Sequence, residues 1–171
     1  MRTLFASVLL SLVLALPAQA AIDAKFAKCQ LPGDLTQAQA EIVLKGALAK
    51  AVDQGVPMNI AVVDAGGNLK AFMRMDGAFL GSIDISIGKA ETARLFNMSS
   101  ADLGKAAQPG GELYGIGVTN DRLVIFGGGE LLRDANGVII GAIGCSGGSV
   151  AEDTNVAKAG VAALNASYKK K

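Results

Sequence analysis

Three sets of residues in this sequence have types and spacings that could do chemistry. The first is Gly144-Cys145-Ser146-Gly147-Gly148, which matches the G-x-S-x-G pattern of a nucleophilic serine on a strand-to-helix turn. Such a serine needs a general base, normally an imidazole, and the chain of 171 residues contains no histidine. A lysine such as Lys89 would have to take that role, so the pattern alone does not make Ser146 a nucleophile.

The same turn could instead bind an anion. If a helix begins here, the amides of Gly147, Gly148 and Ser149 would point at a bound carboxylate or phosphate. Glu152 and Asp153 lie in the same first turn, where they complement the helix dipole and would repel an outside anion. A ligand-binding loop and a glycine turn with acidic capping therefore both remain open.

The second set surrounds the motif Arg74-Met75-Asp76-Gly77, where a predicted strand ends and the chain turns toward a helix. Ser82, Asp84 and Lys89 follow on that helix, and together these mixed charges could line the mouth of a pocket. They could equally form surface ion pairs, which contribute little to stability.

The third set consists of soft donor atoms. Met73 and Met75 share one face of a predicted strand and could contact a flat apolar ligand, although methionines on strands also fill cores. The absence of histidine excludes a zinc site of the H-E-x-x-H type and a histidine ligand to haem, and no metal site is predicted. The set comprises Met58, Met73, Met75, Met98, Tyr114 and Cys145.

The elements that must position these residues can be read from periodicity and turn signals. Thr36-Gln37-Ala38-Gln39 has the form of a capping box and opens a helix that runs to about Val52. Two strands, 58–64 and 69–75, flank a Gly-Gly-Asn turn and predict a hairpin. Helices are then predicted over 82–96 and from Ser99 or Ser100 to Lys105.

The second half of the chain predicts a β meander followed by a helix. Asn136-Gly137 is a strong hairpin turn that leads into a strand over 138–145, and the last helix runs over about 149–166. Adjacent strands joined by tight turns indicate an antiparallel sheet flanked by helices, a single-domain α+β fold. The apolar runs assigned to the meander are 114–118, 123–126 and 130–132.

Residues 1–20 have the pattern of a secretory signal peptide. Arg2 precedes an apolar run, and Ala18-Gln19-Ala20 forms an A-x-A cleavage site. The run is shorter than the ~20 residues of a transmembrane helix, so we expect cleavage after Ala20 and no stable membrane insertion. These features predict a periplasmic or secreted protein with an N-terminal extension over 21–34 and one domain over 35–171.

Charge and cysteine content restrict the partners further. Without Arg2, the 16 basic residues become 15 and balance the 15 acidic residues, which disfavours a nucleic-acid partner. Export implies an oxidising compartment, in which Cys29 and Cys145 could form a disulfide. Two separate thiols, with Cys145 buried, are the alternative, and the sequence does not give the separation of the two Cα atoms that would decide.

Three stretches of the sequence carry longer motifs. They are AVVDAGGNLKAFMRMDGA over Ala61–Ala78, a K-A-x-T-A motif within Ser82–Ala93, and GVIIGAIGCSGG followed by EDTNVAKAG within Gly137–Gly160. Together they resemble the GlcG/HbpS family. The family includes extracellular haem-binding and haem-degrading proteins and is similar to the C-terminal domain of PduO-type corrinoid adenosyltransferases. The resemblance covers about residues 35–164.

The resemblance implies an antiparallel five-stranded sheet with helices, profilin-like in topology, in a homo-oligomer that is often an octamer. It also implies a tetrapyrrole or another small ligand. Arg74, Asp76 and Lys89 match the family's R-M-D-G-A and K-A-x-T-A motifs, and Gly147 and Gly148 match its S-G-G turn.

Two departures from the family affect these expectations. Cys145 stands where the family usually has valine, which makes a disulfide to Cys29 more attractive. Without histidine, haem would need a Met, Tyr, Cys, Lys or oxygen ligand, or would be held by shape and stacking alone.

The combined interpretation is an exported homo-oligomer that binds haem or a related tetrapyrrole. In the predicted pocket, Arg74 and Lys89 would pair with ligand carboxylates and the glycine amides would donate hydrogen bonds. The predicted ligand-binding residues are Arg74, Asp76, Ser82, Lys89, Gly147, Gly148 and Ser149.

Two alternatives remain. One is an enzyme acting on a small carboxylate metabolite, with Lys89 or Asp76 as general acid or base and the glycine amides stabilising an oxyanion. The other is an assembly protein whose apolar helix face, formed by Ile83, Ile87 and Ala90, makes the subunit contacts.

Overall fold

The computed structural model describes residues 33–169, and within them four antiparallel strands form one sheet. The predicted signal peptide, Cys29 and most of the extension over 21–34 lie outside the described residues. The strand order is β2-β1-β4-β3, so β2 and β3 are the two edges. The strands are β1 (Asn59–Val63), β2 (Leu69–Arg74), β3 (Gly129–Arg133) and β4 (Ile139–Ser146).

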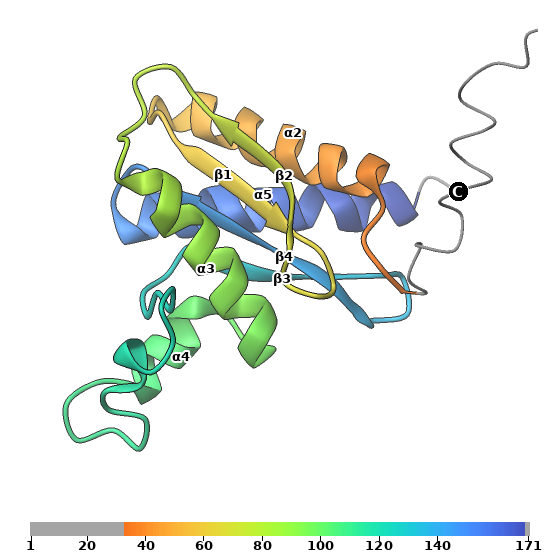
Figure 1. The fold of residues 1–171 in the computed structure, drawn as a ribbon. Coiled ribbons are helices and arrows are strands. Elements are labelled where there is room, and N and C mark those ends of the chain that lie inside the picture. The colour runs from red at the N-terminus through yellow and green to blue at the C-terminus, as the bar shows by residue number, and fades with distance from the viewer. Residues whose placement is uncertain (1–32, 170–171) are drawn as a thin grey trace, which may run out of the picture. The chain divides into compact units, whose positions relative to one another are not determined.

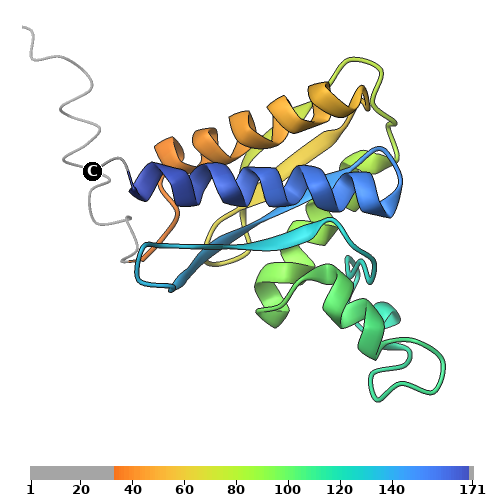
Figure 2. The same cartoon turned by 180° about the vertical axis from the view of Figure 1, so that it is seen from behind.

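Helices cover both faces of the sheet (Figures 1 and 2). On one face, α2 (Gln37–Gln54) and α5 (Val150–Tyr168) lie side by side, as Figure 2 shows. On the other face α3 (Ser82–Phe96) packs on β1, β3 and β4, with the short α4 (Ser100–Ala106) beside it. The α+β class predicted from the order of elements is therefore confirmed.

The predicted helix starts are also confirmed. Thr36 and Gln39 form the expected capping box of α2, and Ser149 and Glu152 form a second one at the start of α5. Helix α2 ends at Gly55, whose φ of 68° is the left-handed conformation that glycine adopts without strain.

Both hairpin turns are held by an aspartate. The Asp64 Oδ1 accepts hydrogen bonds from the amides of Gly66 and Asn68 between β1 and β2. The Asp134 Oδ1 does the same for the amides of Asn136 and Val138 between β3 and β4. The predicted hairpins thus follow from local turn chemistry.

The five-stranded sheet implied by the resemblance is wrong for the described residues, because two predicted runs form no strand. Residues 114–118 enter a 3₁₀ turn, η2 (Ile116–Val118), after Gly115 adopts a φ of 88°. In the run 123–126, the amide of Val124 donates to the Thr92 hydroxyl instead of pairing with a neighbouring strand. The sequence predicted strands here because a short apolar run is compatible with both a strand and a loop packed against the core.

The core differs between the two faces of the sheet. Toward α2 and α5 it consists of large aliphatic side chains such as Ile60, Ile143 and Leu164. Toward α3 it consists of small ones, with Ala90 and Ala142 at its centre. All of these residues are buried, and the small residues bring α3 close to the strands.

Candidate functional site

Lys89, the predicted partner for ligand carboxylates, belongs to α3 and is fully buried. Its Nζ donates hydrogen bonds to the Asp153 carboxylate (2.6 Å to Oδ2) and to the Cys145 carbonyl oxygen (2.9 Å). The ammonium also lies 4.7 Å from the centre of the Phe126 ring, within cation–π range. Burial lowers the pKa of Lys89, and Asp153 partly opposes that effect.

Asp153 joins this lysine to the glycine turn. Its second oxygen, Oδ1, accepts hydrogen bonds from the amides of Gly147 (3.1 Å) and Gly148 (3.0 Å). The carboxylate is 2% exposed and completes a buried ion pair that ties α3, the end of β4 and α5 together. Three of the groups predicted to bind a ligand, the Lys89 ammonium and the amides of Gly147 and Gly148, thus bind Asp153 instead.

Glycines just before β3, at its first residue and on β4 make room for the buried pair. A Cβ on Gly128, whose φ is 119°, would lie 2.8 Å from the Lys89 Nζ. A Cβ on Gly129 would meet the Lys89 carbonyl oxygen, and one on Gly144 would meet the Ser86 carbonyl oxygen. The close approach of α3 to the sheet therefore requires glycine at these positions.

The other predicted site residues gather near the start of α3. The strand register aligns Arg74, Asn59 and Ser146 in one row across β2, β1 and β4. Arg74 and Asp76 are exposed, whereas Ser82 at the start of α3 is buried. Their role as ligand-binding residues stays a prediction.

Asn59 is a member of this row that the sequence analysis missed. Its side chain is fully buried, and its Nδ2 donates to the Phe79 carbonyl oxygen at 2.9 Å. Its Oδ1 is buried without a hydrogen-bond partner among the described residues. An asparagine at the start of an apolar strand run was the only signal in the sequence.

The G-x-S-x-G match does not mark a nucleophilic serine in this structure. Ser146 is 4% exposed, and the chain has no histidine to activate it. Ser149 caps α5 by accepting from the Glu152 amide, so its hydroxyl has a structural role.

Burial strongly raises the pKa of the Cys145 thiol, which keeps it protonated and unreactive at neutral pH. Cys29 lies outside the described residues, so the disulfide stays a prediction.

The soft donors separate into buried and accessible ones. Met58 and Cys145 are fully buried in the core, and the Met75 sulfur accepts from the Met58 amide. Met98 is 37% exposed and lines a cleft, whereas the exposed Tyr114 does not.

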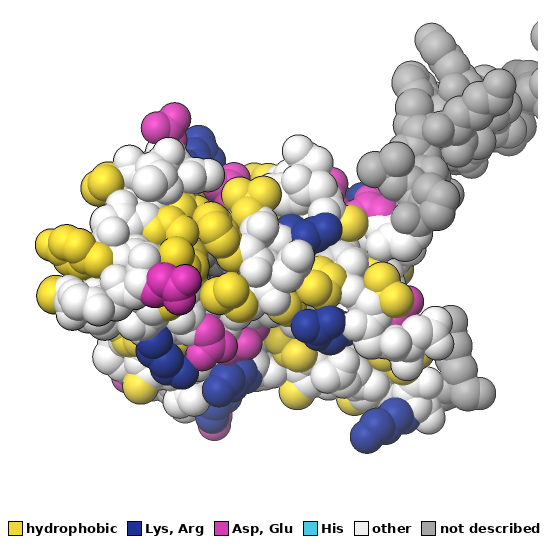
Figure 3. Space-filling model, turned by 90° about the horizontal axis from the view of Figure 1, so that it is seen from below, with side chains coloured by type: hydrophobic (Ala, Val, Ile, Leu, Met, Phe, Trp, Pro, Cys, Tyr) yellow, Lys and Arg dark blue, Asp and Glu magenta, His cyan; other side chains and the backbone are white. Residues whose placement is uncertain are grey.

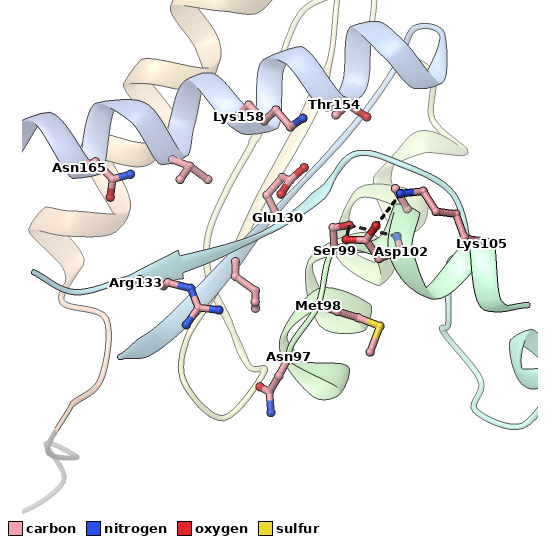
Figure 4. A pocket seen from close by; sticks show the side chains of 13 residues that line it. Asn97, Met98, Ser99, Asp102, Lys105, Glu130, Arg133, Thr154, Lys158 and Asn165 are labelled. Carbon is pink, nitrogen blue, oxygen red and sulfur yellow. Dashed lines mark hydrogen bonds and ion pairs between the residues drawn. The ribbon is translucent and has the colours of Figure 1, made fainter. Parts of the chain in front are cut away.

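That cleft of about 620 Å³ lies beside the edge strand β3, between α4 and α5 (Figure 4). Basic side chains line it from three elements, and two acidic side chains, Asp102 and Glu130, lie among them. Burial raises the pKa of Glu130, while Lys158 lowers it, and in Figure 4 the two side chains point toward one another. The lining residues are Asn97, Met98, Ser99, Ala101, Asp102, Lys105, Glu130, Leu131, Arg133, Thr154, Lys158, Val161 and Asn165.

No local pattern in the sequence marks this cleft, because its residues come from three separate segments, 97–105, 130–133 and 154–165. Only Met98 was singled out beforehand, as one of six soft donors. Within residues 33–169 there is no cluster of three His, Cys, Asp or Glu side chains that could hold a metal ion, and no helix is long and apolar enough to cross a membrane. On the face shown in Figure 3, acidic and basic side chains lie interspersed among apolar ones.

The layered helix–sheet–helix fold and its side cleft define a small α+β domain with room for a small molecule. Residues 35–162 match the family model described as haem-degrading protein HbpS-like, and the chain belongs to this family. An uncharacterised 15.0 kDa protein of Citrobacter freundii, from the dhaT-dhaS intergenic region, is 44% identical over 77% of this chain and 92% of its own length.

Two further similarities concern PduO. The corrinoid adenosyltransferase PduO of Citrobacter freundii is 37% identical over 71% of this chain, but the match spans only 36% of that protein. The crystal structure of a PduOC–haem complex superposes with a TM-score of 0.74 at 34% identity, covering 77% of this chain and 96% of that one. The family resemblance identified from the motifs is thus confirmed.

Proposed function

We propose that this chain is an exported homo-oligomer that binds haem or a related tetrapyrrole. The observation that carries the proposal is the relative crystallised with haem, which shares this fold and 34% of its residues with this chain. The match covers 96% of that chain, so the likeness extends over nearly the whole of the relative.

The cleft beside β3 supports the proposal. Its volume of about 620 Å³ lies within the range of about 300 to 1,000 Å³ typical of small-molecule sites. Its donor set suits a tetrapyrrole, because Met98 offers a thioether, which haem iron accepts as a ligand, and Lys105 and Lys158 offer charge to ligand carboxylates.

The hypothesis of an acid–base enzyme has no comparable support. The Lys89 Nζ is 0% exposed and bonded to Asp153, so it has no contact with solvent through which to meet a substrate. Asp76, the other proposed acid or base, lies exposed on the turn before α3, and among the described residues the ion-pair partner of Lys89 is Asp153, not Asp76. We therefore favour binding over acid–base catalysis.

Assembly and export form part of the proposal. Phe79 and Leu80, adjacent in sequence before α3, are each 70% exposed, which suits a subunit contact. Ala90, one of the residues predicted to make such a contact, cannot take part in it, because it is fully buried against the sheet. Light scattering after size exclusion tests the oligomer, and the N-terminal sequence of protein exported by a bacterial host tests cleavage after Ala20.

The binding itself is tested by titrating the mature chain, residues 21–171, with haemin while following the Soret band. We expect a saturable shift that ends at one haem per chain. A spectrum that remains that of free haemin at all ratios would overturn the proposal. Arg74→Gln, at the site predicted from the motifs, serves as a comparison that should leave the titration unchanged if the β3 cleft is the site.

A further inference from the structure

The cleft beside β3 combines one accessible soft donor with cations from three different elements. Met98 lies on the turn between α3 and α4, Lys105 on α4, Arg133 on β3 and Lys158 on α5. Resting on the proposed function, we infer that the tetrapyrrole lies in this cleft with the Met98 sulfur on its iron and its propionates paired with the three cations.

Exposure and position together select Met98 among the soft donors of the described residues, because Tyr114 is more exposed, at 69%, but does not line the cleft. Met58 and Cys145 are fully enclosed, and Met75 packs against the core with its sulfur accepting from a backbone amide. Met98 is 37% exposed and lies on the cleft wall. A thioether carries no proton to lose, and it is one of the side chains that ligate iron in haem proteins.

The three cations differ in how firmly they are held. Lys105 pairs with Asp102 at 2.7 Å, and both side chains are largely exposed, so a ligand carboxylate can compete for the ammonium. Arg133 donates to the Gly137 carbonyl oxygen at 2.9 Å, which uses one of the five N–H donors of its guanidinium. Lys158 lies near the half-buried Glu130.

The sum of these charges favours an anionic ligand. Three basic and two acidic side chains line the cleft, so its formal net charge is +1. Between them, Leu131 and Val161 provide an apolar surface for a macrocycle. Since β3 pairs only with β4 among the described strands, its outer side is free of a neighbouring strand and leaves room for a flat ligand.

The ligation is tested by comparing haemin spectra of the wild type, Met98→Leu and Met73→Leu. Leucine keeps the volume of methionine but has no donor sulfur, and Met73 is a half-buried methionine of β2 outside the cleft. We expect the wild type and Met73→Leu to give the same Soret and visible bands with bound haemin, and Met98→Leu to give shifted bands while still binding haemin. Circular dichroism confirms that each variant is folded.

The propionate contacts are tested with the double variant Lys105→Gln/Lys158→Gln and with haemin dimethyl ester, whose carboxylates are blocked. The double variant should bind haemin about tenfold more weakly, as expected for two exposed ion pairs, and should bind the ester as the wild type does.

The outcomes separate the two proposals. A wild type that does not bind haemin overturns both. A wild type that binds haemin with the same bands as Met98→Leu overturns the ligation by Met98 and leaves the proposed function standing. Equal weakening for haemin and its ester in the double variant would overturn the propionate pairing.

Discussion

The two faces of the sheet are built from different chemistry, and neighbouring residues of β4 show the contrast. Ile143 points toward α2 and α5 and packs among aliphatic side chains. Gly144 faces α3 so closely that a Cβ there would meet the backbone of Ser86 and Ala90. The face toward α2 and α5 is stabilised by the burial of large apolar side chains, whereas the face toward α3 encloses the Lys89–Asp153 ion pair.

The contrast shows that motif residues can be structural. Lys89, Gly147 and Gly148 belong to the motifs that suggested a ligand pocket, yet their polar groups bind Asp153. The accessible cleft lies instead at the edge of the sheet, around residues such as Met98 and Lys158. The predictions that follow test this separation of roles.

The largest effect is expected for Lys89→Met. Removing one partner of a buried ion pair leaves the other charge uncompensated, so the free energy of unfolding should fall by about 3 to 5 kcal/mol in urea denaturation. Lys50→Met breaks the exposed pair with Asp53 on α2 and should change it by less than about 1 kcal/mol. A loss for Lys89→Met as small as that of the control would contradict a structural role for the pair.

Gly144→Ala should have the second largest effect and lower the free energy of unfolding by about 3 kcal/mol, because the added methyl group forces α3 away from the sheet. Gly81→Ala is the matched control, since a Cβ there meets nothing within 4 Å and should alter stability by no more than about 0.5 kcal/mol. Thermal unfolding measures both. Equal melting temperatures for the two variants would refute the tight packing of α3.

Ile143→Val, one residue away on the opposite face, should cost only about 1 kcal/mol, because a single methylene group is lost from a well-packed aliphatic core. Urea denaturation of this variant and of Gly144→Ala compares the two faces at adjacent positions. A larger loss of stability for Ile143→Val than for Gly144→Ala would contradict the conclusion that the face toward α3 is the more tightly packed one.

The smallest effect concerns Glu130, whose carboxyl pKa burial raises above its usual value of 4.5. The folded state therefore keeps this proton to higher pH than the unfolded state, and the free energy of unfolding declines as pH rises from about 4.5 through the raised pKa. Glu130→Gln lacks this decline, so it should match the wild type below that range and be more stable above it. Urea denaturation at a series of pH values from below 4.5 to neutral measures the difference in stability between the wild type and Glu130→Gln, with Glu112→Gln at an exposed position as control. A Glu130→Gln variant less stable than the wild type at neutral pH would contradict this expectation.

Local signals predicted much of the fold. The capping box at Thr36, the helix over Ser82–Phe96 and the two hairpin turns all depend on residues within a few positions of one another. The strands predicted over 114–118 and 123–126 are wrong, because these apolar runs bend at glycines such as Gly115 and pack as a loop.

The site was harder to predict, because its contacts join distant positions. Lys89 and Asp153 are 64 residues apart, and Asp153 looked from the sequence like an ordinary helix-capping acid. The cleft likewise gathers residues from α4, β3 and α5, so no local spacing marks it. Only the sheet register and the packing of helices bring these groups together.

The central claim, that the ligand lies beside β3 and not at the buried pair, is tested most directly by amide proton–nitrogen NMR spectra of the mature chain titrated with diamagnetic gallium protoporphyrin. We expect the amide signals of Met98, Leu131 and Lys158 to shift strongly, while those of Lys89 and Gly147 stay in place. Strong shifts at Lys89 and Gly147, with the β3 cleft unchanged, would contradict it.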